Sequence, residues 1–120
     1  MKKLRCHCGA IEAEINITGN FDKILRCNCS LCKRKGAVMS MVKNDDFKIT
    51  KGIDKLGFYQ FHTKVAKHFF CTICGIYTHH NPRSNPAMTG FNLGCIDETD
   101  TFSLKDILIN DGHNHPLDKK

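Results

Sequence analysis

No run of apolar residues in this sequence is long enough to cross a membrane, and none follows the basic opening Met1-Lys2-Lys3-Leu4. A membrane-spanning helix needs about 20 consecutive apolar residues, and a secretory signal peptide needs an apolar core of roughly 7–15 residues. We therefore expect neither segment, and we expect a cytoplasmic, reducing location for the chain. In such a compartment, clustered cysteines favour metal binding over disulfide bonds.

Tryptophan is absent, and aromatic residues are not interleaved with basic residues along the chain. Proteins that bind nucleic acid commonly combine such aromatics with a dense basic face. The sequence offers neither feature, so a nucleic-acid partner is disfavoured.

Internal repeats, low-complexity linkers and long segments with a helical period of 3.6 residues are also absent. Short apolar stretches separated by frequent turn residues are present instead. Residues 10–17 alternate apolar and polar side chains, which is typical of a strand with one buried face. The pattern predicts an all-β sandwich in one domain over residues 1–120, with at most a short helical turn.

The expected elements follow from the turn residues that bound them. We predict strands over residues 10–17, 37–42, 47–50, 56–61, 67–70, 76–79, 89–96 and 107–110. One helical turn is predicted over residues 103–106, with Ser103 as its cap. The basic stretch Lys33-Arg34-Lys35 is interpreted as a solvated turn.

Cysteine is abundant, and seven of the eight cysteines fall into three short groups. A single cysteine behaves as a small hydrophobic residue, whereas several that converge act as soft metal ligands. The grouped residues are too close together to be independent core positions, and they predict zinc ligands. The groups are Cys6 with Cys8; Cys27, Cys29 and Cys32; and Cys71 with Cys74.

Counting divides the groups into a set of four and a set of three. Structural zinc takes four protein ligands in a closed tetrahedron, whereas catalytic zinc keeps three and leaves one position open. The two short-spaced pairs make a natural set of four. Residues i and i+2 of an extended segment point the same way, so Cys6 and Cys8 can reach one ion. Gly75, which follows the second pair, is free to take a positive φ angle.

The remaining set, Cys27, Cys29 and Cys32, can direct three sulfurs at one point and leave the fourth side open. We predict that it holds a second, catalytic zinc ion. The alternative is a second structural site completed by Cys95 or by a histidine. Cys95 alone is interpreted as a buried small residue.

The formal net charge of +6 must be corrected for bound metal. Seven thiolates would subtract seven charges and two zinc ions would add four, which halves the positive excess. The positive net charge that remains is weak support for nucleic-acid binding, but it is compatible with attracting an anionic small molecule.

These motifs carry a family resemblance. Cys6-His7-Cys8-Gly9, the Cys27–Cys32 triplet and Phe70-Cys71 through Cys74-Gly75 resemble, in order, the motifs of the glutathione-dependent formaldehyde-activating enzyme family. Arg83-Ser84-Asn85-Pro86, residues 92–97, and Asp111-Gly112 with His115-Pro116 are similar to its branch related to centromere protein V. The resemblance covers nearly the whole chain.

The resemblance implies a zinc-bearing β-sandwich of twisted antiparallel sheets, also found in a Rab-binding exchange factor and in B-type methionine sulfoxide reductases. It implies structural zinc at the first and third cysteine groups and catalytic zinc at the triplet. The implied activity is that of a carbon–sulfur lyase, the reversible addition of a thiol such as glutathione to formaldehyde or another small aldehyde. The shared fold also raises a redox role for Cys95 as an alternative.

Other candidates are weaker. Arg83 lies in a loop bounded by prolines, where it could pair with a carboxylate of glutathione, although most loop arginines are solvated. His79 and His80 could lie near a zinc ion or simply alternate on a strand. His62 and His68 are interpreted as surface or satisfied core positions, and the tail from His113 as polar. A non-catalytic zinc-binding interaction module is the alternative function.

Overall fold

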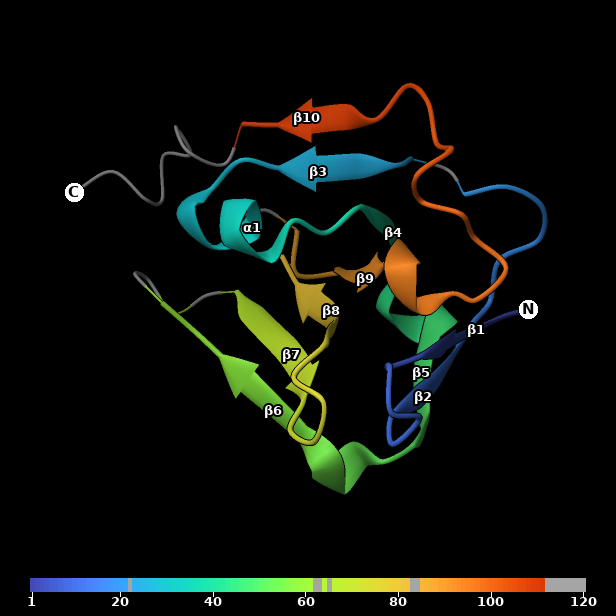
Figure 1. Cartoon of the computed structure of the whole chain (residues 1–120), viewed down its shortest axis with the longest axis vertical. Coiled ribbons are helices and arrows are strands. Elements are labelled where there is room, and N and C mark those ends of the chain that lie inside the picture. The colour runs from blue at the N-terminus through green and yellow to red at the C-terminus, as the bar shows by residue number, and fades with distance from the viewer. Residues whose placement is uncertain (22, 62–63, 65, 83–84, 112–120) are drawn as a thin grey trace.

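The computed structural model describes residues 1–21, 23–61, 64, 66–82 and 85–111. Within these ranges the chain forms ten strands in two sheets, one short α-helix and three 3₁₀ turns (Figure 1). The mostly-β fold predicted from the alternating pattern is confirmed. No helix in the described part of the chain is long and apolar enough to span a membrane.

The smaller sheet is antiparallel and has the strand order β1 (Lys2–Arg5), β2 (Glu12–Ile15) and β5 (Phe47–Lys51). The larger sheet has the order β10 (Leu108–Asn110), β3 (Leu25–Cys27), β4 (Met39–Lys43), β9 (Met88–Asn92), β8 (Tyr77–Asn81), β7 (Lys67–Cys71) and β6 (Leu56–Tyr59). The helical segments are α1 (Ser30–Lys35), η1 (Asn44–Asp46), η2 (Ile53–Lys55) and η3 (Leu93–Cys95).

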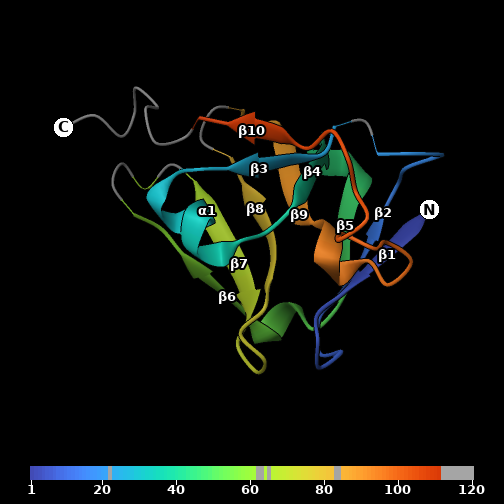
Figure 2. The same ribbon diagram turned by 45° about the horizontal axis from the view of Figure 1, so that its top comes forward.

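The main hydrophobic core lies where the smaller sheet meets β4, β9 and η3. The alternation that predicted the strand at residues 10–17 places Ala13 and Ile15 fully inside it. Burying each large apolar side chain contributes about 1.5–3 kcal/mol. Figure 2 shows β1, β2 and β5 on one side of the molecule and α1, β6 and β7 on the other. The core residues are Leu4, Ala13, Ile15, Val42, Phe91, Leu93, Cys95 and Ile96.

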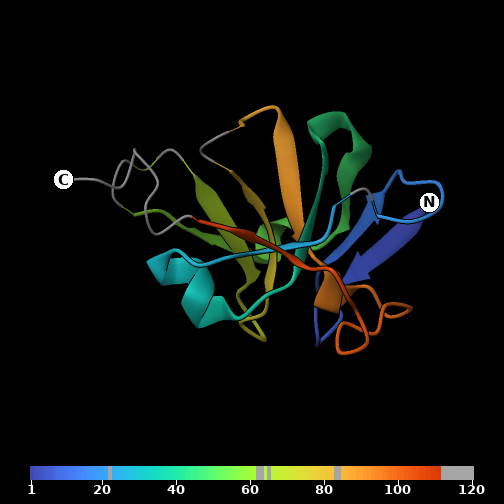
Figure 3. The same ribbon diagram turned by 90° about the horizontal axis from the view of Figure 1, so that it is seen from above.

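Strand β10 pairs with β3 in parallel, which corrects the expectation that all strands would be antiparallel. The register sets Leu108 opposite Leu25 and Asn110 opposite Cys27. Strand β3 meets β4 through a single residue pair, and Figure 3 shows β3 and β10 running across the neighbouring strands. The direction of β10 depends on the path of the chain between η3 and β10. The apolar pattern within β10 does not predict that direction.

Two local predictions are wrong for identifiable reasons. The strand expected over residues 89–96 ends at Asn92, because the Asn92 side chain accepts a hydrogen bond from the Gly94 N–H at 3.0 Å and η3 follows. Asparagine commonly competes with sheet pairing in this way. The helical turn expected over residues 103–106 does not form. The Ser103 hydroxyl donates to the Asp100 carbonyl at 3.0 Å instead of capping a helix.

Two glycines with nearly equal backbone angles test how tightly the structure packs near the first cysteine pair. Gly52 has φ +81°, and a Cβ there would lie 1.9 Å from the Ala10 carbonyl oxygen. Gly19 has φ +82°, with no atom within 4 Å of such a Cβ. We expect Gly19→Ala to lower the free energy of unfolding by about 1–2 kcal/mol, the cost of the left-handed conformation.

Gly52→Ala should lower the free energy of unfolding by at least about 2 kcal/mol more than Gly19→Ala does, because the backbone at Ala10 must move. Urea unfolding of the metal-loaded protein measures both losses. Equal losses would mean that the contact between Gly52 and Ala10 adds nothing to stability.

Candidate metal centres

Four cysteines from distant parts of the chain meet at one site. Their sulfurs all lie within 4.8 Å of one another, and the Cys8 sulfur is 3.7 Å from those of Cys6 and Cys71. Sulfurs at about 2.3 Å from one tetrahedral zinc ion would lie about 3.8 Å apart, so the spacing fits zinc. It is far beyond the disulfide bond length of about 2.05 Å, and all eight cysteines are free. The four are Cys6, Cys8, Cys71 and Cys74.

Tight turns hold both pairs. The Gly9 N–H donates to the Cys6 carbonyl at 3.1 Å, and the Gly75 N–H donates to the Cys71 carbonyl at 2.8 Å. Both glycines have positive φ, which confirms the expectation for Gly75. Cys6 and Cys8 are therefore brought together by a turn. The extended segment that we predicted for this pair does not occur.

Backbone N–H groups point at the sulfurs of this set. The Ile11 N–H donates to the Cys6 sulfur at 3.2 Å, and the N–H groups of Ile73 and Cys74 donate to the Cys71 sulfur at 3.4 and 3.5 Å. Hydrogen bonds of this kind favour the thiolate, which is the form that binds metal. The donor set therefore fits a metal ion chemically as well as geometrically.

The second cluster is built by the junction of β3 and α1. Cys27 ends β3, Cys29 is the N-cap of α1, and Cys32 lies in its first turn. The Cys32 N–H donates to the Cys29 sulfur at 3.3 Å, so one thiol caps the helix. The three sulfurs lie within 4.8 Å of one another, and this set could also bind a metal ion.

In the ranges that the structure describes, no histidine, carboxylate or further cysteine joins this group of three. Cys95 lies in the main core, and its thiol donates to the Tyr77 carbonyl at 3.6 Å. The interpretation of Cys95 as a buried small residue is confirmed, and it does not complete the second cluster. Burial raises the pKa of the Cys95 thiol to about 12.

The three thiols do not share charge equally. Hydrogen bonds from Cys27 and Cys32 hold the pKa of Cys29 well below its usual value, although burial opposes this shift. The N-terminal peptide dipoles of α1 also favour the thiolate form of Cys29.

Strand β10 closes one side of this cluster. The Asn110 side-chain amide donates to the Cys27 sulfur at 3.6 Å, and the Asn110 carbonyl accepts from the Asn28 N–H at 3.1 Å. Asn28 also donates to Asp111 at 3.2 Å. The sequence analysis missed Asn110, because 83 residues separate it from Cys27 and its one signal was a place at the end of a predicted strand.

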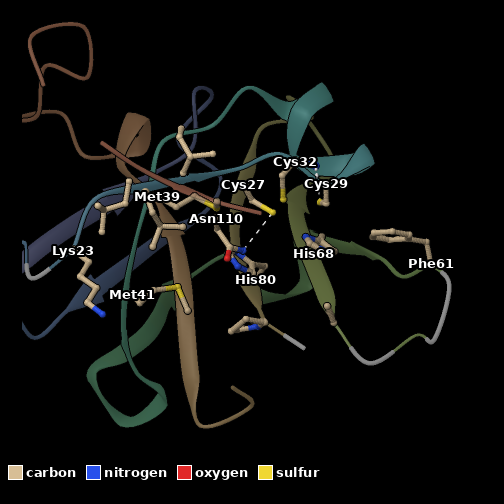
Figure 4. A pocket seen from close by; sticks show the side chains of 15 residues that line it. Lys23, Cys27, Cys29, Cys32, Met39, Met41, Phe61, His68, His80 and Asn110 are labelled. Atoms are coloured by element: carbon tan, nitrogen blue, oxygen red, sulfur yellow. Dashed lines mark hydrogen bonds between the residues drawn. The ribbon is translucent and has the colours of Figure 1, made fainter. Parts of the chain in front are cut away.

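A cavity of about 370 Å³ lies against the three sulfurs (Figure 4). In this view the thiols of Cys27, Cys29 and Cys32 are drawn just above the rings of His68 and His80, which line the same cavity. Polar groups on the wall come from Lys23, His68, His80 and Asn110. The apolar wall consists of Leu25, Met39, Met41, Phe61, Ala66, Pro82, Leu108 and Ile109. The four-cysteine set does not line this cavity.

The two histidines on the cavity wall belong to a buried polar cluster. The rings of His68 and His80 stack with centroids 5.5 Å apart. The Lys35 ammonium lies 2.8 Å from His68 Nδ1, and the Tyr77 hydroxyl oxygen lies 2.5 Å from His80 Nδ1. Burial, with a smaller contribution from the charge of Lys35, lowers the pKa of His80 to about 3, so this ring is neutral at pH 7.

The structure resolves the expectations for the histidines and the basic stretch. His68 is a satisfied core residue, as expected. His79 stacks on Phe69 at 4.5 Å, whereas the next residue, His80, lines the cavity beside the three sulfurs, so successive rings of this strand face different neighbours, although both are buried. A place for His80 near a zinc ion stays a prediction. The interpretation of Lys33-Arg34-Lys35 as a solvated turn is wrong for Lys35. This residue ends α1, and its side chain contacts His68. Arg83, His62, His113 and His115 lie outside the described residues.

Comparison with known proteins gives consistent matches. A family model described as "Glutathione-dependent formaldehyde-activating enzyme" matches residues 1–107. The crystal structure of a Rhodobacter sphaeroides protein is similar, with a TM-score of 0.85 and 40% sequence identity, covering 90% of this chain and 99% of that one.

Two curated fungal proteins, from Fusarium vanettenii and Penicillium rubens, are 30% and 29% identical over 79 residues. Both are provisionally named as glutathione-dependent formaldehyde-activating enzymes. The alignments cover 62% of this chain but only 42% and 41% of the fungal proteins, so the chain spans less than half the length of these relatives.

We expect two zinc ions per chain that are lost in two separate steps. The closed set of four thiolates should resist a chelator, whereas the set of three should release its metal readily, because no residue in the described ranges supplies a fourth ligand. Elemental analysis during a chelator titration in reductant measures this. Cys27→Ser should abolish only the labile step, and simultaneous loss of both ions from the unaltered protein would contradict the division into two sites.

Substitutions at the two sites should differ in their effect on folding. Cys71→Ser should unfold the protein, because structural zinc can contribute about 10–16 kcal/mol, as much as the whole stability of a typical domain. Cys29→Ser should remain folded, because serine is itself a good N-cap for α1. Thermal melts followed by circular dichroism compare the two. Similar melting temperatures would exclude the structural role of the four-cysteine site.

Proposed function

The chain belongs to the glutathione-dependent formaldehyde-activating enzyme family, and on this premise we propose a carbon–sulfur lyase activity centred on Cys27, Cys29 and Cys32. These residues would hold a zinc ion, and the cavity beside them would receive both substrates. The substrates are a thiol, such as glutathione, and formaldehyde or another small aldehyde. Cys6, Cys8, Cys71 and Cys74 would hold a second zinc ion with a structural role.

One observation carries this proposal: three sulfurs converge at the wall of a cavity large enough for a small molecule. Within the described residues, no fourth protein ligand closes this set, unlike the four-sulfur set. A metal ion bound here would keep a position open toward the cavity, as catalytic zinc sites do.

Zinc bound by the three thiolates would supply a fourth ligand position at which a thiol loses its proton and is held as a nucleophile. In the addition, a bond forms between the substrate sulfur and the aldehyde carbon. The electron pair of the carbonyl π bond moves to oxygen, and that oxygen takes up a proton. The reverse reaction breaks the carbon–sulfur bond, returns the proton and releases thiol and aldehyde.

The cavity wall provides for binding and orientation. Leu25 and Met39 offer apolar surface that would exclude water from the reacting atoms, and the Asn110 amide offers a hydrogen-bond donor beside Cys27. Lys23 is an exposed cation on the same wall and could pair with a carboxylate of glutathione. The same role for Arg83 is a proposal from the sequence alone.

Free thiols at every cysteine suit a reducing compartment, which supports a cytoplasmic location as a further proposal.

The thiol itself should dominate recognition of glutathione. We expect S-methylglutathione, whose sulfur cannot become a thiolate, to bind at least about tenfold more weakly than glutathione. Binding of glutathione at pH 7 should release close to one proton, and the release should shrink as pH approaches the thiol pKa of about 8.5. Calorimetry in buffers of different ionisation enthalpy measures affinity and proton release together.

The matched control is Cys29→Ser, which should remain folded and bind both ligands with the same weak affinity. If unaltered protein binds the methylated and free thiols equally, sulfur ligation is not part of recognition. The alternative, a non-catalytic zinc-binding interaction module, would then be favoured.

A further inference from the structure

The three basic residues of α1 have different environments. Lys33 and Arg34 are exposed, and Arg34 donates to the Ser30 carbonyl of its own helix at 2.8 Å. Lys35 follows Cys32 by three positions and lies on the same side of the helix. Its side chain enters the interior, toward β7 and β8.

The Lys35 ammonium contacts an imidazole ring and a phenol ring. It lies 2.8 Å from His68 Nδ1 and 3.7 Å from the centroid of the Tyr77 ring. Among the described residues, no salt bridge joins Lys35 to a carboxylate. Lys35 is half-buried, and a charge held partly away from water is costly without a counter-charge, so a nearby negative charge is expected.

The cysteine cluster is where that negative charge would arise. Three thiolates around one divalent ion leave a net charge of minus one, and a thiolate as fourth ligand would make it minus two. Burial lowers the pKa of Lys35, whereas negative charge on Cys32, Cys29 and Cys27 raises it. The lysine and the cluster therefore stabilise each other's charged states.

His68 links the lysine to the cavity. An ammonium group can only donate hydrogen bonds, so His68 Nδ1 accepts and the ring proton is on Nε2. The ring lines the same cavity as the three sulfurs and stacks on His80. Lys35 thereby fixes the tautomer and polarises a ring that faces the substrate space.

We propose that Lys35 is the built-in counter-charge of the three-cysteine metal site, and that it makes this site selective for anionic sulfur ligands. The inference rests on the metal binding in the proposed function, but not on lyase activity. Lys35 is a positioning residue, because it acts through the charge of the cluster and through His68. Without it, the third thiolate and then a fourth would each add negative charge that Lys35 no longer balances. Lys23, on the same cavity wall, is exposed, so solvent screens its charge more strongly.

Four variants separate the possible causes. Lys35→Met removes the charge and the hydrogen bond but keeps an unbranched apolar stem. Lys35→Gln removes the charge but can still donate to His68. Lys33→Met removes the same charge from the exposed face of the same helix, so it controls for net charge. Lys35→Arg keeps the charge. Circular dichroism, together with the metal content of the four-cysteine site, shows which of the variants are folded.

Two probes are measured on the full chain at pH 7.5. The first is the affinity of the second Co²⁺ ion, from its absorption in competition with a chelator. The second is the affinity of glutathione for the Co²⁺-loaded protein, from the change in sulfur-to-metal charge-transfer absorption. Lys35→Met and Lys35→Gln should each weaken both affinities at least about tenfold, whereas Lys33→Met should change them less than about threefold.

The outcomes separate this inference from the lyase proposal. If Lys35→Gln binds both probes as the unaltered protein does, the charge has no role and the inference is overturned. If the unaltered protein binds the second Co²⁺ but not glutathione, the proposed function fails, and the Co²⁺ affinities alone decide the role of Lys35. If no second Co²⁺ binds, both proposals fail. Should Lys35→Met unfold, Lys35→Gln against Lys35→Arg gives the same comparison.

Discussion

The structure depends on bringing sulfur atoms from distant parts of the chain close enough to share a metal ion. Thiolates that converge within 4.8 Å repel one another unless a cation lies between them. In the four-cysteine set, this requirement joins the turn after β1 to the end of β7. A small core cluster of Cys6, Ile11 and Cys71 adds apolar packing at this junction. The main core lies elsewhere, between the two sheets.

The two candidate metal centres differ in the groups that surround their sulfurs. In the first set, two tight turns direct backbone N–H groups at the sulfurs of Cys6 and Cys71, and four thiols are present for one ion. The second set has a cavity on one side, a helix cap at Cys29 and a half-buried lysine on the same helix. A closed shell suits a structural ion, and an asymmetric one suits an ion that exchanges a ligand. In the proposed function, the same residue type would serve two purposes because its neighbours differ.

The second centre is also assembled from remote parts of the larger sheet. Strands β7 and β8 supply His68 and His80, and β10 supplies Asn110. The crossing of β3 and β10 over the sheet, seen in Figure 3, brings these groups to one cavity. The three candidate ligands lie in one short motif, but the polar residues of the cavity wall come from strands that are far apart in the sequence. Substitutions in those strands can therefore alter the chemistry without touching a ligand.

The sequence by itself determined the strand alternation, the turn at Gly75 and the spacing of the cysteines within each group, because each is set by residues close together in the chain. Counting ligands then predicted how the groups combine. It could not determine that β10 lies parallel to β3, that Asn110 reaches Cys27, or that Lys35 points inward while Lys33 does not. Spacing records which ligands fit one ion, but strand direction and the facing of a side chain depend on packing against segments far away in the chain. Only the tertiary structure decided that one cluster is closed and the other lies open to a cavity.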